Sequence, residues 1–380
     1  MAIEKVTLGI GSLAEGPRVL DLGPEHPSRA GLIMLDCDIA DGLVVQAEVR
    51  TGFLHRGAEK LFEVRDYRQL LMLADRHDWQ SAFTGELGAA LACEAMLGLA
   101  APPRAVWLRT LLAELARMAS HLAFLSFVPH RLADLSAANA VRASREAFRG
   151  QLLALTGNRV HPMVNRLGGL SVDADEAWLA SVGVWAADVA NLADRLQKLL
   201  ETPRWREIST TGALSPSQIG SFGLSGPIAR SAGLERDLRR TPGYLNYPLL
   251  DFGQPPSKGE ARDSSACGRI SELVEDLSVS RVLVDQCIEA LADVGGPVST
   301  DLAKIIKLPE GAGHYSLEAP WGVAGWHIVS RGERTPWRVK LRTPTWANMS
   351  ALGAALAGTP VDHVDVVVAS LGYTIGDLDK

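Results

Sequence analysis

Residues 23–31 read GPEHPSRAG, a stretch whose two prolines fix φ and whose terminal glycines permit positive φ. It therefore predicts a tight loop. Strand-like runs at residues 18–22 and 32–39 flank it, so we expect a hairpin that presents His26 and Arg29 at its tip. Taken alone, the loop is also compatible with an ordinary polar connection.

The residues around this loop predict a small N-terminal sheet over residues 1–50. A turn is expected at Asp41 and Gly42, between the run that ends near residue 39 and a further strand-like run at residues 44–49. We expect these strands to pair as an antiparallel sheet with its tip at the opening loop.

Over residues 57–202 the pattern changes to a helical period, which predicts a bundle. Ser171 is the expected N-cap of a long helix that ends before Pro203, after a break at the glycine pair 168–169. The earlier helices are expected at residues 58–73, 79–97, 104–127 and 132–156.

Residues 203–260 are rich in loops, and residues 262–380 return to helix and strand. We interpret 203–260 as an excursion wrapped on the bundle, because five of its apolar side chains need burial: Tyr244, Tyr247, Leu249, Leu250 and Phe252. We expect a helix at 262–293, strands within 311–342 around a turn at Gly332, and a short helix at 348–357. No domain boundary is evident, so residues 1–380 are expected to form one α+β domain.

Composition excludes several classes of protein. A net charge of -6 gives no general attraction for nucleic acid. The 4 cysteines form no C-x-x-C pair, so zinc-ribbon and redox-dithiol sites lack their signature. The first residues lack a signal-peptide pattern, and no apolar run reaches the roughly 18 residues that would span a bilayer. If the protein works at a membrane, other subunits must hold it there.

Two further motifs follow the opening loop: residues 51–61 read TGFLHRGAEKL and residues 75–79 read DRHDW. In order and spacing, the three stretches resemble the D subunit of proton-pumping NADH-quinone oxidoreductase (complex I), whose motifs read roughly GPxHPxxHG, HRGxEK and DRxDY. The resemblance continues through RVHPMVNRLGG at 159–169 and EAPWG at 318–322 to GDLDK at the end, so it covers nearly the whole chain. Three ordered motifs are specific, whereas any one would be weak.

The resemblance implies the fold of nickel–iron hydrogenase large subunits: mainly a helical bundle, with a small N-terminal antiparallel sheet and a C-terminal β element. It implies a subunit that forms a quinone pocket beside the terminal [4Fe–4S] cluster of a B subunit and supports electron transfer to quinone. A C subunit and a quinone-channel membrane subunit would be further partners. The chain would lie at the cytoplasmic side of the membrane and would hold no redox cofactor or metal alone, since NADH binds elsewhere in the assembly.

The quinone ligands of this family are replaced here. In the family, a histidine before the closing glycine of the first motif bonds one quinone oxygen; that position is Ala30, before Gly31. The tyrosine that ends the third motif donates to the other oxygen; that position is Trp79, whose indole N–H cannot give up a proton at ordinary pH. Arg131 falls near the place of the aspartate that partners the missing histidine.

Other residues of the same motifs are candidate substitutes. His26, Arg29 and His77 could supply hydrogen bonds or protons to the quinone, beside Arg76 and Asp78 of the third motif. The alternative is that these are structural polar residues in a diverged site. His121, on an apolar helical stretch, is interpreted as a core or interface histidine.

Arg56 and His161 match the family more closely. By the resemblance, both face the terminal [4Fe–4S] cluster of the B subunit, where a cationic or donor group stabilises the reduced cluster. Ordinary salt bridging or capping is the alternative for such a pair.

Two other functions compete with this one. A metal-bearing hydrogenase needs two C-x-x-C motifs, and neither residues 51–54 nor 370–373 contain cysteine, so we reject a nickel–iron site. The second is a non-catalytic structural subunit of a complex-I-like or hydrogenase-like membrane complex that has lost quinone reduction. The joint replacement at Ala30 and Trp79 favours it, whereas retention of Arg56 and His161 argues against it.

Overall fold

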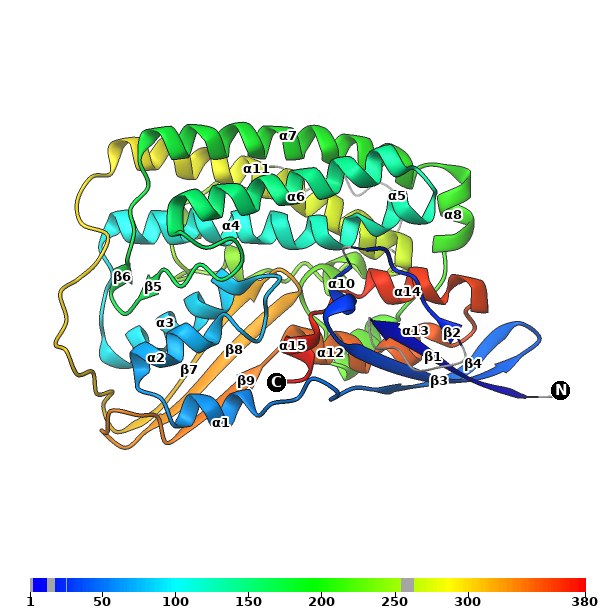
Figure 1. Cartoon of the computed structure of the whole chain (residues 1–380), viewed down its shortest axis with the longest axis horizontal. Coiled ribbons are helices and arrows are strands. Elements are labelled where there is room, and N and C mark those ends of the chain that lie inside the picture. Colours follow the sequence, from blue (N-terminus) through cyan, green and yellow to red (C-terminus); the bar gives the residue numbers. More distant parts are fainter. Residues whose placement is uncertain (1–2, 12–17, 25, 254–262) are drawn as a thin grey trace.

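A computed structural model describes residues 3–11, 18–24, 26–253 and 263–380. Glu25, the side chain of Ala30 and residues 254–262 lie outside this description, and with them the predicted replacement of a quinone ligand by the Ala30 side chain. Long helices lie together as one layer, and the strands and most of the shorter helices form a second layer beneath them (Figure 1).

The N-terminal sheet has the strand order β2-β1-β3-β4. Its strands are β1 Glu4–Gly11, β2 Arg18–Val19, β3 Leu32–Ala40 and β4 Leu43–Arg50. Strand β1 pairs antiparallel with β3 but parallel with β2, so the expectation of a wholly antiparallel sheet is wrong. Because β1 lies between β2 and β3, the opening loop is not the tip of a hairpin.

The expected turn at Asp41 and Gly42 is confirmed. Both residues have positive φ, 52° and 76°, which matches the twist of a tight β-hairpin between β3 and β4.

The C-terminal strands form a separate antiparallel sheet in the order β7-β8-β9. They are β7 Gly311–Ala319, β8 Gly322–Ser330 and β9 Arg338–Arg342, and the predicted turn at Gly332 joins the last two. A small ladder of β5 Asn165–Arg166 and β6 Gly169–Leu170 accompanies the break at the glycine pair, which is confirmed.

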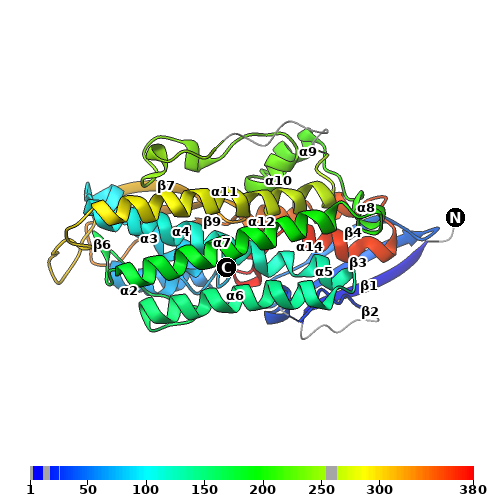
Figure 2. The same cartoon turned by 90° about the horizontal axis from the view of Figure 1, so that it is seen from above.

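The bundle is built on α4, whose residues are almost all buried. Its helices are α3 Ala82–Leu97, α4 Pro103–Leu125, α5 Phe127–Arg131, α6 Leu135–Thr156, α7 Glu176–Leu200 and α11 Ala266–Asp293. Seen from above, α6, α7 and α11 lie side by side over α4 (Figure 2). Within the described residues, one helical stretch, residues 103–131, is long and apolar enough to span a membrane, and its apolar window is 100% buried inside the protein.

Two helix boundaries differ from expectation because side chains cap elsewhere. The helix expected at 58–73 is two helices, α1 Ala58–Glu63 and α2 Tyr67–Ala74, since Asp66 accepts hydrogen bonds from the amides of Arg68 and Gln69 and starts the second. Asp175 rather than Ser171 caps α7. The Ser171 hydroxyl instead donates to the carbonyl of Val164.

The described part of the excursion, residues 203–253, packs along the bundle beside α11 (Figure 2). Its elements are α8 Pro203–Ser209, α9 Pro216–Ser221, α10 Gly226–Ser231, η2 Leu238–Arg240 and η3 Tyr247–Leu249. Four of the five apolar side chains expected inside it are buried, but Leu249, at the end of η3, is 71% exposed. Buried ion pairs hold the excursion to the bundle: Arg239 of η2 bonds Glu114 of α4 at 3.2 Å and Asp276 of α11 at 3.3 Å.

The C-terminal residues turn back into the interior. The last elements are α12 Pro344–Ser350, α13 Leu352–Leu356, η4 Val361–His363, α14 Val364–Ser370 and α15 Ile375–Leu378. The carboxylate of Asp379 accepts hydrogen bonds from the amides of Gly52 and Leu54 at 2.7 and 2.8 Å. The C-terminus therefore lies in the interior, against the backbone of the second motif.

Candidate functional site

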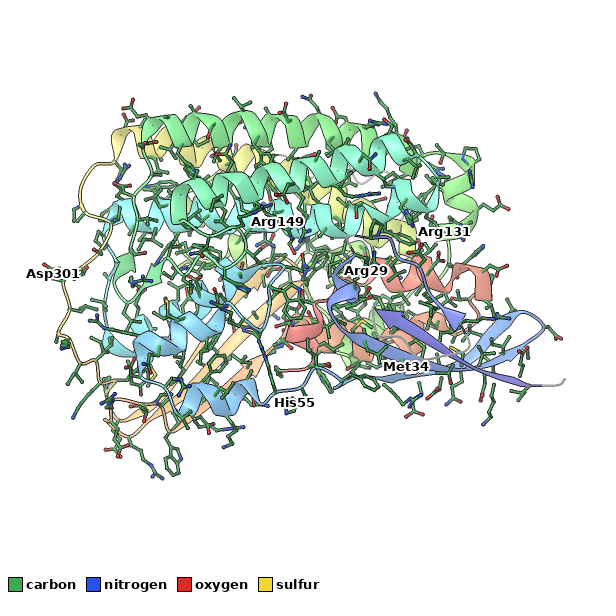
Figure 3. All side chains as sticks on the ribbon, in the orientation of Figure 1. Arg29, Met34, His55, Arg131, Arg149 and Asp301 are labelled. Carbon is green, nitrogen blue, oxygen red and sulfur yellow. The ribbon has the colours of Figure 1, made fainter. Side chains whose placement is uncertain are left out.

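The opening loop folds inward. His26 caps the short helix η1 Pro27–Ala30, because its Nδ1 accepts a hydrogen bond from the Ser28 amide at 3.2 Å. Its ring is 2% exposed and packs edge-on against Phe124, with the ring centroids 4.8 Å apart. Burial lowers the pKa of His26 to about 3, so the ring is neutral at pH 7. The prediction of His26 as an exposed tip is wrong, whereas Arg29 of η1 is exposed (Figure 3).

Arg131 is paired with a carboxylate from the C-terminal region. Its Nε donates to Asp365 of α14 at 2.6 Å, which ties α5 to α14. The neighbouring His130 lies against the loop instead, since its ring is 3.3 Å from the position that a Cβ at Gly23 would occupy.

The second and third motifs meet around Asp75, which is fully buried. Its Oδ1 accepts from Arg76 Nε at 2.8 Å, and its Oδ2 lies 3.4 Å from Nδ1 of His161. Arg56 Nη2 donates to the carbonyl of Arg76 at 2.9 Å. We call Arg56, Arg76, His161 and Asp75 the Asp75 site. The structure thus brings together the two residues that the sequence suggested would face a cluster.

Two buried glutamates of α3 position the segment that carries His161. Glu86 accepts hydrogen bonds from the amides of Met163, Val164 and Asn165 at 2.6, 2.9 and 2.9 Å. Burial raises the pKa of Glu86 to about 7 although these donors favour its ionised form. The segment is thus fixed to the bundle on one side of His161.

Glu94 fixes the same segment further along. It forms a buried bidentate pair with Arg109 at 2.8 and 2.9 Å and accepts from the Gly168 amide at 2.7 Å. Arg109 in turn donates to the carbonyls of Arg166 and Gly169, both at 2.9 Å. A bidentate pair of this kind fixes orientation as well as distance.

Helix α15 lies between the first and third motifs. A Cβ on Gly31 would lie 2.4 Å from Ile375, and a Cβ on Gly376 would lie 2.2 Å from the Trp79 ring. His77 Nε2 is 3.5 Å from Asp377 Oδ1, while burial lowers the pKa of His77 to about 4. The first motif and DRHDW therefore pack on the same short helix, which Figure 1 shows beside the C-terminus.

A small cavity of about 40 Å³ opens beside Trp79. Its wall includes Ser81 of the loop before α3, Ala116 and Ala119 of α4, and Phe148 of α6. Three arginines also line it, Arg145, Arg149 and Arg159. Apolar side chains and three arginines thus share the wall of this small cavity.

Comparison with known proteins gives consistent matches over the whole chain. Residues 132–380 match the family model described as respiratory-chain NADH dehydrogenase, 49 Kd subunit. The chain is 40% identical to the NADH-quinone oxidoreductase D 2 subunit of Salinispora arenicola, over 100% of this chain and 98% of that one. It is 41% identical to the D 1 subunit of Streptomyces coelicolor, over 99% of both chains.

The chain belongs to the 49-kDa D-subunit family of NADH-quinone oxidoreductases. A more distant member, the D 2 subunit of Solibacter usitatus, is 32% identical over 95% of this chain and 97% of that one. The predicted resemblance is confirmed, and with it the α+β fold shared with hydrogenase large subunits.

Within the described parts of the chain, no group of 3 or more histidine, cysteine or acidic side chains has the arrangement to hold a metal ion. Cys37, Cys93 and Cys287 are buried, and burial raises the pKa of each thiol above its ordinary value. The backbone amides of Gly52 and Leu54 bond a residue from the C-terminal end, Asp379, which carries a carboxylate and not a thiolate.

Sequence reasoning missed three residues of this D-subunit site: Glu86, Glu94 and Asp377. The first two are acidic residues on an Ala- and Leu-rich helix, and acidic side chains are seldom fully buried without partners. The position of these two acidic residues on an apolar helix could therefore have indicated buried partners for them. The burial of Asp377 depends on the return of the C-terminus into the interior, which its own motif does not reveal.

Proposed function

We propose that this D-subunit chain forms the quinone-binding pocket of its NADH-quinone oxidoreductase, beside the terminal [4Fe–4S] cluster of a B subunit. Electrons pass from that cluster to quinone, and this chain supplies the pocket and the groups around the cluster. NADH reacts elsewhere in the assembly, so the isolated chain is inactive.

The observation that carries the proposal is the assembly of the Asp75 site from separate segments. Arg56 is exposed and fixed through the Arg76 carbonyl, and His161 is fixed beside Asp75. Positive or hydrogen-bonding groups beside an iron–sulfur cluster stabilise its reduced form and raise its potential. An exposed arginine held in one orientation is suited to that role.

Exposed apolar side chains flank this arginine in the sequence and support a protein partner on this part of the chain. Four large apolar residues are exposed between residues 53 and 64: Phe53 (52%), Leu54 (37%), Leu61 (40%) and Val64 (62%). Clustered exposed apolar residues are typical of interaction surfaces. We assign this face to the B subunit, and the rest of the assembly to a C subunit and a quinone-channel membrane subunit at the cytoplasmic side of the membrane.

The chemistry at the quinone requires hydrogen-bond donors for two oxygens as negative charge develops. We assign the head-group end of the pocket to the cavity beside Trp79, with Arg29, Arg76 and Asp78 nearby in the two motifs that pack on α15. His26 and His77 are neutral at pH 7 because burial lowers their pKa values, to about 3 and about 4. Each can donate an N–H but holds no additional proton there.

A substitution at the Asp75 site tests the proposed position of the cluster. In the assembled complex, Arg56→Met is expected to lower the midpoint potential of the terminal cluster, measured by redox titration with electron paramagnetic resonance. Arg65→Met, a change at another exposed arginine in the same part of the chain, is the control. Equal potentials in the two variants would place Arg56 away from the cluster.

The second candidate is the structural subunit without quinone reduction, favoured by the burial of His26 and the replacement of both family ligands at Ala30 and Trp79. Electron transfer sensitive to a quinone analogue, measured in membranes that carry the assembled complex, separates the two. Activity in the native complex supports a rebuilt pocket. Activity only in the double variant Ala30→His, Trp79→Tyr supports the structural subunit.

A further inference from the structure

Imidazole and cationic side chains form a row across the C-terminal sheet. His314 of β7 pairs in register with His327 of β8, and His327 pairs with Lys340 of β9, so the three side chains lie on one face of the sheet. Arg342, two residues after Lys340, lies on the same face. The other face is buried, since Trp326 of β8 packs against α3. The row therefore lies on the face that points away from α3.

This face forms part of the wall of a groove of about 930 Å³. The lining of the groove also includes Trp346 of α12, and Asp379 and Lys380 beyond α15. We call it the Trp346 groove. Trp346 is 54% exposed, and it also lines a smaller groove of about 380 Å³ beside β4. Tryptophans that are exposed in a hollow of this kind are typical anchors of protein interfaces.

The Trp346 groove presents positive charge through Lys340, Arg342 and Lys380. Arg342 donates to two backbone carbonyls and pairs with no carboxylate among the described residues. Both lysines share the carboxylate of Glu59, at 3.0 and 3.9 Å, and the Lys340 side chain is still 55% exposed. The one acid among the described lining residues is Asp379, whose carboxylate already accepts from two backbone amides. A carboxylate that enters the groove would therefore find cations with which to pair.

The edge of the sheet beside the groove is already occupied. Glu59 and Glu63 of α1 accept hydrogen bonds from the amides of Leu341 and Val339 at 3.0 and 3.4 Å. Both amides belong to β9, the last strand in the order β7-β8-β9. A partner is thus hindered from adding a strand at this edge, and it must bind through side chains on the face of the sheet.

We propose that the Trp346 groove receives an acidic segment of a neighbouring subunit of the complex. Carboxylates of that segment pair with Arg342 and Lys340, and one of its apolar side chains packs on Trp346. Charge complementarity selects the segment, and the exposed indole supplies apolar area that is removed from water on binding. The proposal depends on membership of the D-subunit family, whose chains are subunits of an assembly, and not on quinone reduction.

Burial of the groove on assembly is tested by hydroxyl-radical footprinting of the native chain, alone and in the assembled complex, with mass spectrometry as the readout. Trp337, which lies just before β9 and outside the groove lining, is the internal control, because it is 55% exposed and Trp346 is 54% exposed. Assembly is expected to remove most of the oxidation at Trp346 and to leave that at Trp337 unchanged. Equal oxidation of Trp346 in the free chain and in the complex would overturn the proposal.

The chemistry of the occupant is tested by carbodiimide cross-linking of the assembled complex. The reagent joins an amine and a carboxylate that are in contact, with loss of water. Lys340 is expected to form an amide with an aspartate or glutamate of another subunit, in a yield that falls as added salt screens the charges. Cross-links of Lys340 to Glu59 alone would overturn the acidic segment, and with Trp346 protected they would assign the groove to a neutral surface or to lipid.

The anchor is tested with Trp346→Ala, which is expected to lower the yield of the intersubunit cross-link by about 10-fold. Trp337→Ala is the matched control and is expected to keep the native yield. An unchanged yield in Trp346→Ala would contradict the role of Trp346. If this variant does not assemble, the footprint and the cross-link of the native complex decide the proposal. Quinone reduction is assayed separately on the same complex, so the groove and the proposed function fail independently.

Discussion

The buried side chain of Asp75 contacts residues that are distant from each other in the sequence. Its carboxylate is inaccessible to solvent, and it lies beside groups from two segments that are 85 residues apart, Arg76 and His161. Removing this charged acceptor takes away its hydrogen bond from Arg76 and its contact with His161, and hydrogen bonds to charged groups contribute more than neutral ones.

Asp75→Asn is therefore expected to destabilise the protein by about 1–3 kcal/mol and to release His161. The measurement is urea unfolding of the purified chain. Asp41→Asn is the control, because Asp41 lies in an exposed turn with φ of 52°, a conformation that asparagine accepts. A cost no larger than that of the control would show that Asp75 does not hold the site.

Single buried histidines also make the free energy of unfolding depend on pH. Burial lowers the pKa of His26 to about 3 and those of His77 and His121 to about 4. The unfolded chain binds these protons near pH 6.5 and the folded chain does not, so the free energy of unfolding must fall as the pH drops from about 6.5 to 4.

His121 isolates this effect, because its Nε2 donates to the carbonyl of Pro320 at 3.0 Å in the core. His121→Gln keeps an amide donor but cannot titrate. We expect it to reduce the loss of stability between pH 6.5 and 4 by up to about 3 kcal/mol. The measurement is the urea midpoint at a series of pH values, and a parallel pH dependence in the native and variant proteins would contradict the assignment.

At the scale of elements, the short helix α15 determines how the motifs meet. It has only four residues, Ile375–Leu378, yet it separates η1 from DRHDW. It approaches both so closely because glycines stand at the contacts: Gly31 faces Ile375, and Gly376 faces Trp79. The site thus depends on backbone packing as much as on polar side chains.

Gly376→Ala should therefore force the Trp79 ring and the His77 carbonyl away from α15, since the new Cβ would lie 2.2 and 2.5 Å from them. We expect a loss of about 1–3 kcal/mol in the free energy of unfolding and a change in Trp79 fluorescence. Gly150→Ala is the matched control: Gly150 lies in α6 with nothing within 4 Å of its Cβ position, so alanine there should be stabilising. Equal effects would contradict the packing argument.

At the scale of the whole molecule, buried charges join the excursion to the bundle. Arg239 is 1% exposed and bonds Asp237 of the excursion at 2.7 Å, besides Glu114 of α4 and Asp276 of α11. Its charge is balanced by carboxylates from three parts of the chain. Any change that removes only the cation leaves these carboxylates buried together.

Arg239→Met is accordingly expected to cost about 3–5 kcal/mol of stability and to expose the excursion to limited proteolysis. Lys60→Ala is the control, because the Lys60–Glu63 pair is at the surface, with the Lys60 side chain 76% exposed, and such pairs contribute less than about 1 kcal/mol. Cleavage of the excursion at the native rate would show that its apolar contacts alone hold it.

Local sequence patterns predicted the helices and strands of the fold well, but they predicted less well where each helix begins and ends. The bundle helices, the turn at Asp41, the break at Gly168 and the C-terminal strands follow from periodicity and glycine positions. The errors occur where side-chain partners decide: Asp66 divides a helix, Asp175 replaces Ser171 as a cap, and Leu249 is exposed at the end of η3. Several side chains that are close in sequence could each cap the same helix. The sequence pattern does not show which of them forms the capping hydrogen bond.

The sequence by itself determined the family, the α+β fold and the absence of paired cysteine motifs, because these depend on ordered motifs and residue types. It also predicted a common role for Arg56 and His161, which the structure links through Arg76 and Asp75. Only the tertiary structure decided that His26 is buried and neutral, that Asp75 lies beside His161, and that Asp377 lies beside His77. Burial sets the protonation of His26 and Asp377, and burial depends on elements that are distant in the chain, here above all on the return of the C-terminus between the first and third motifs.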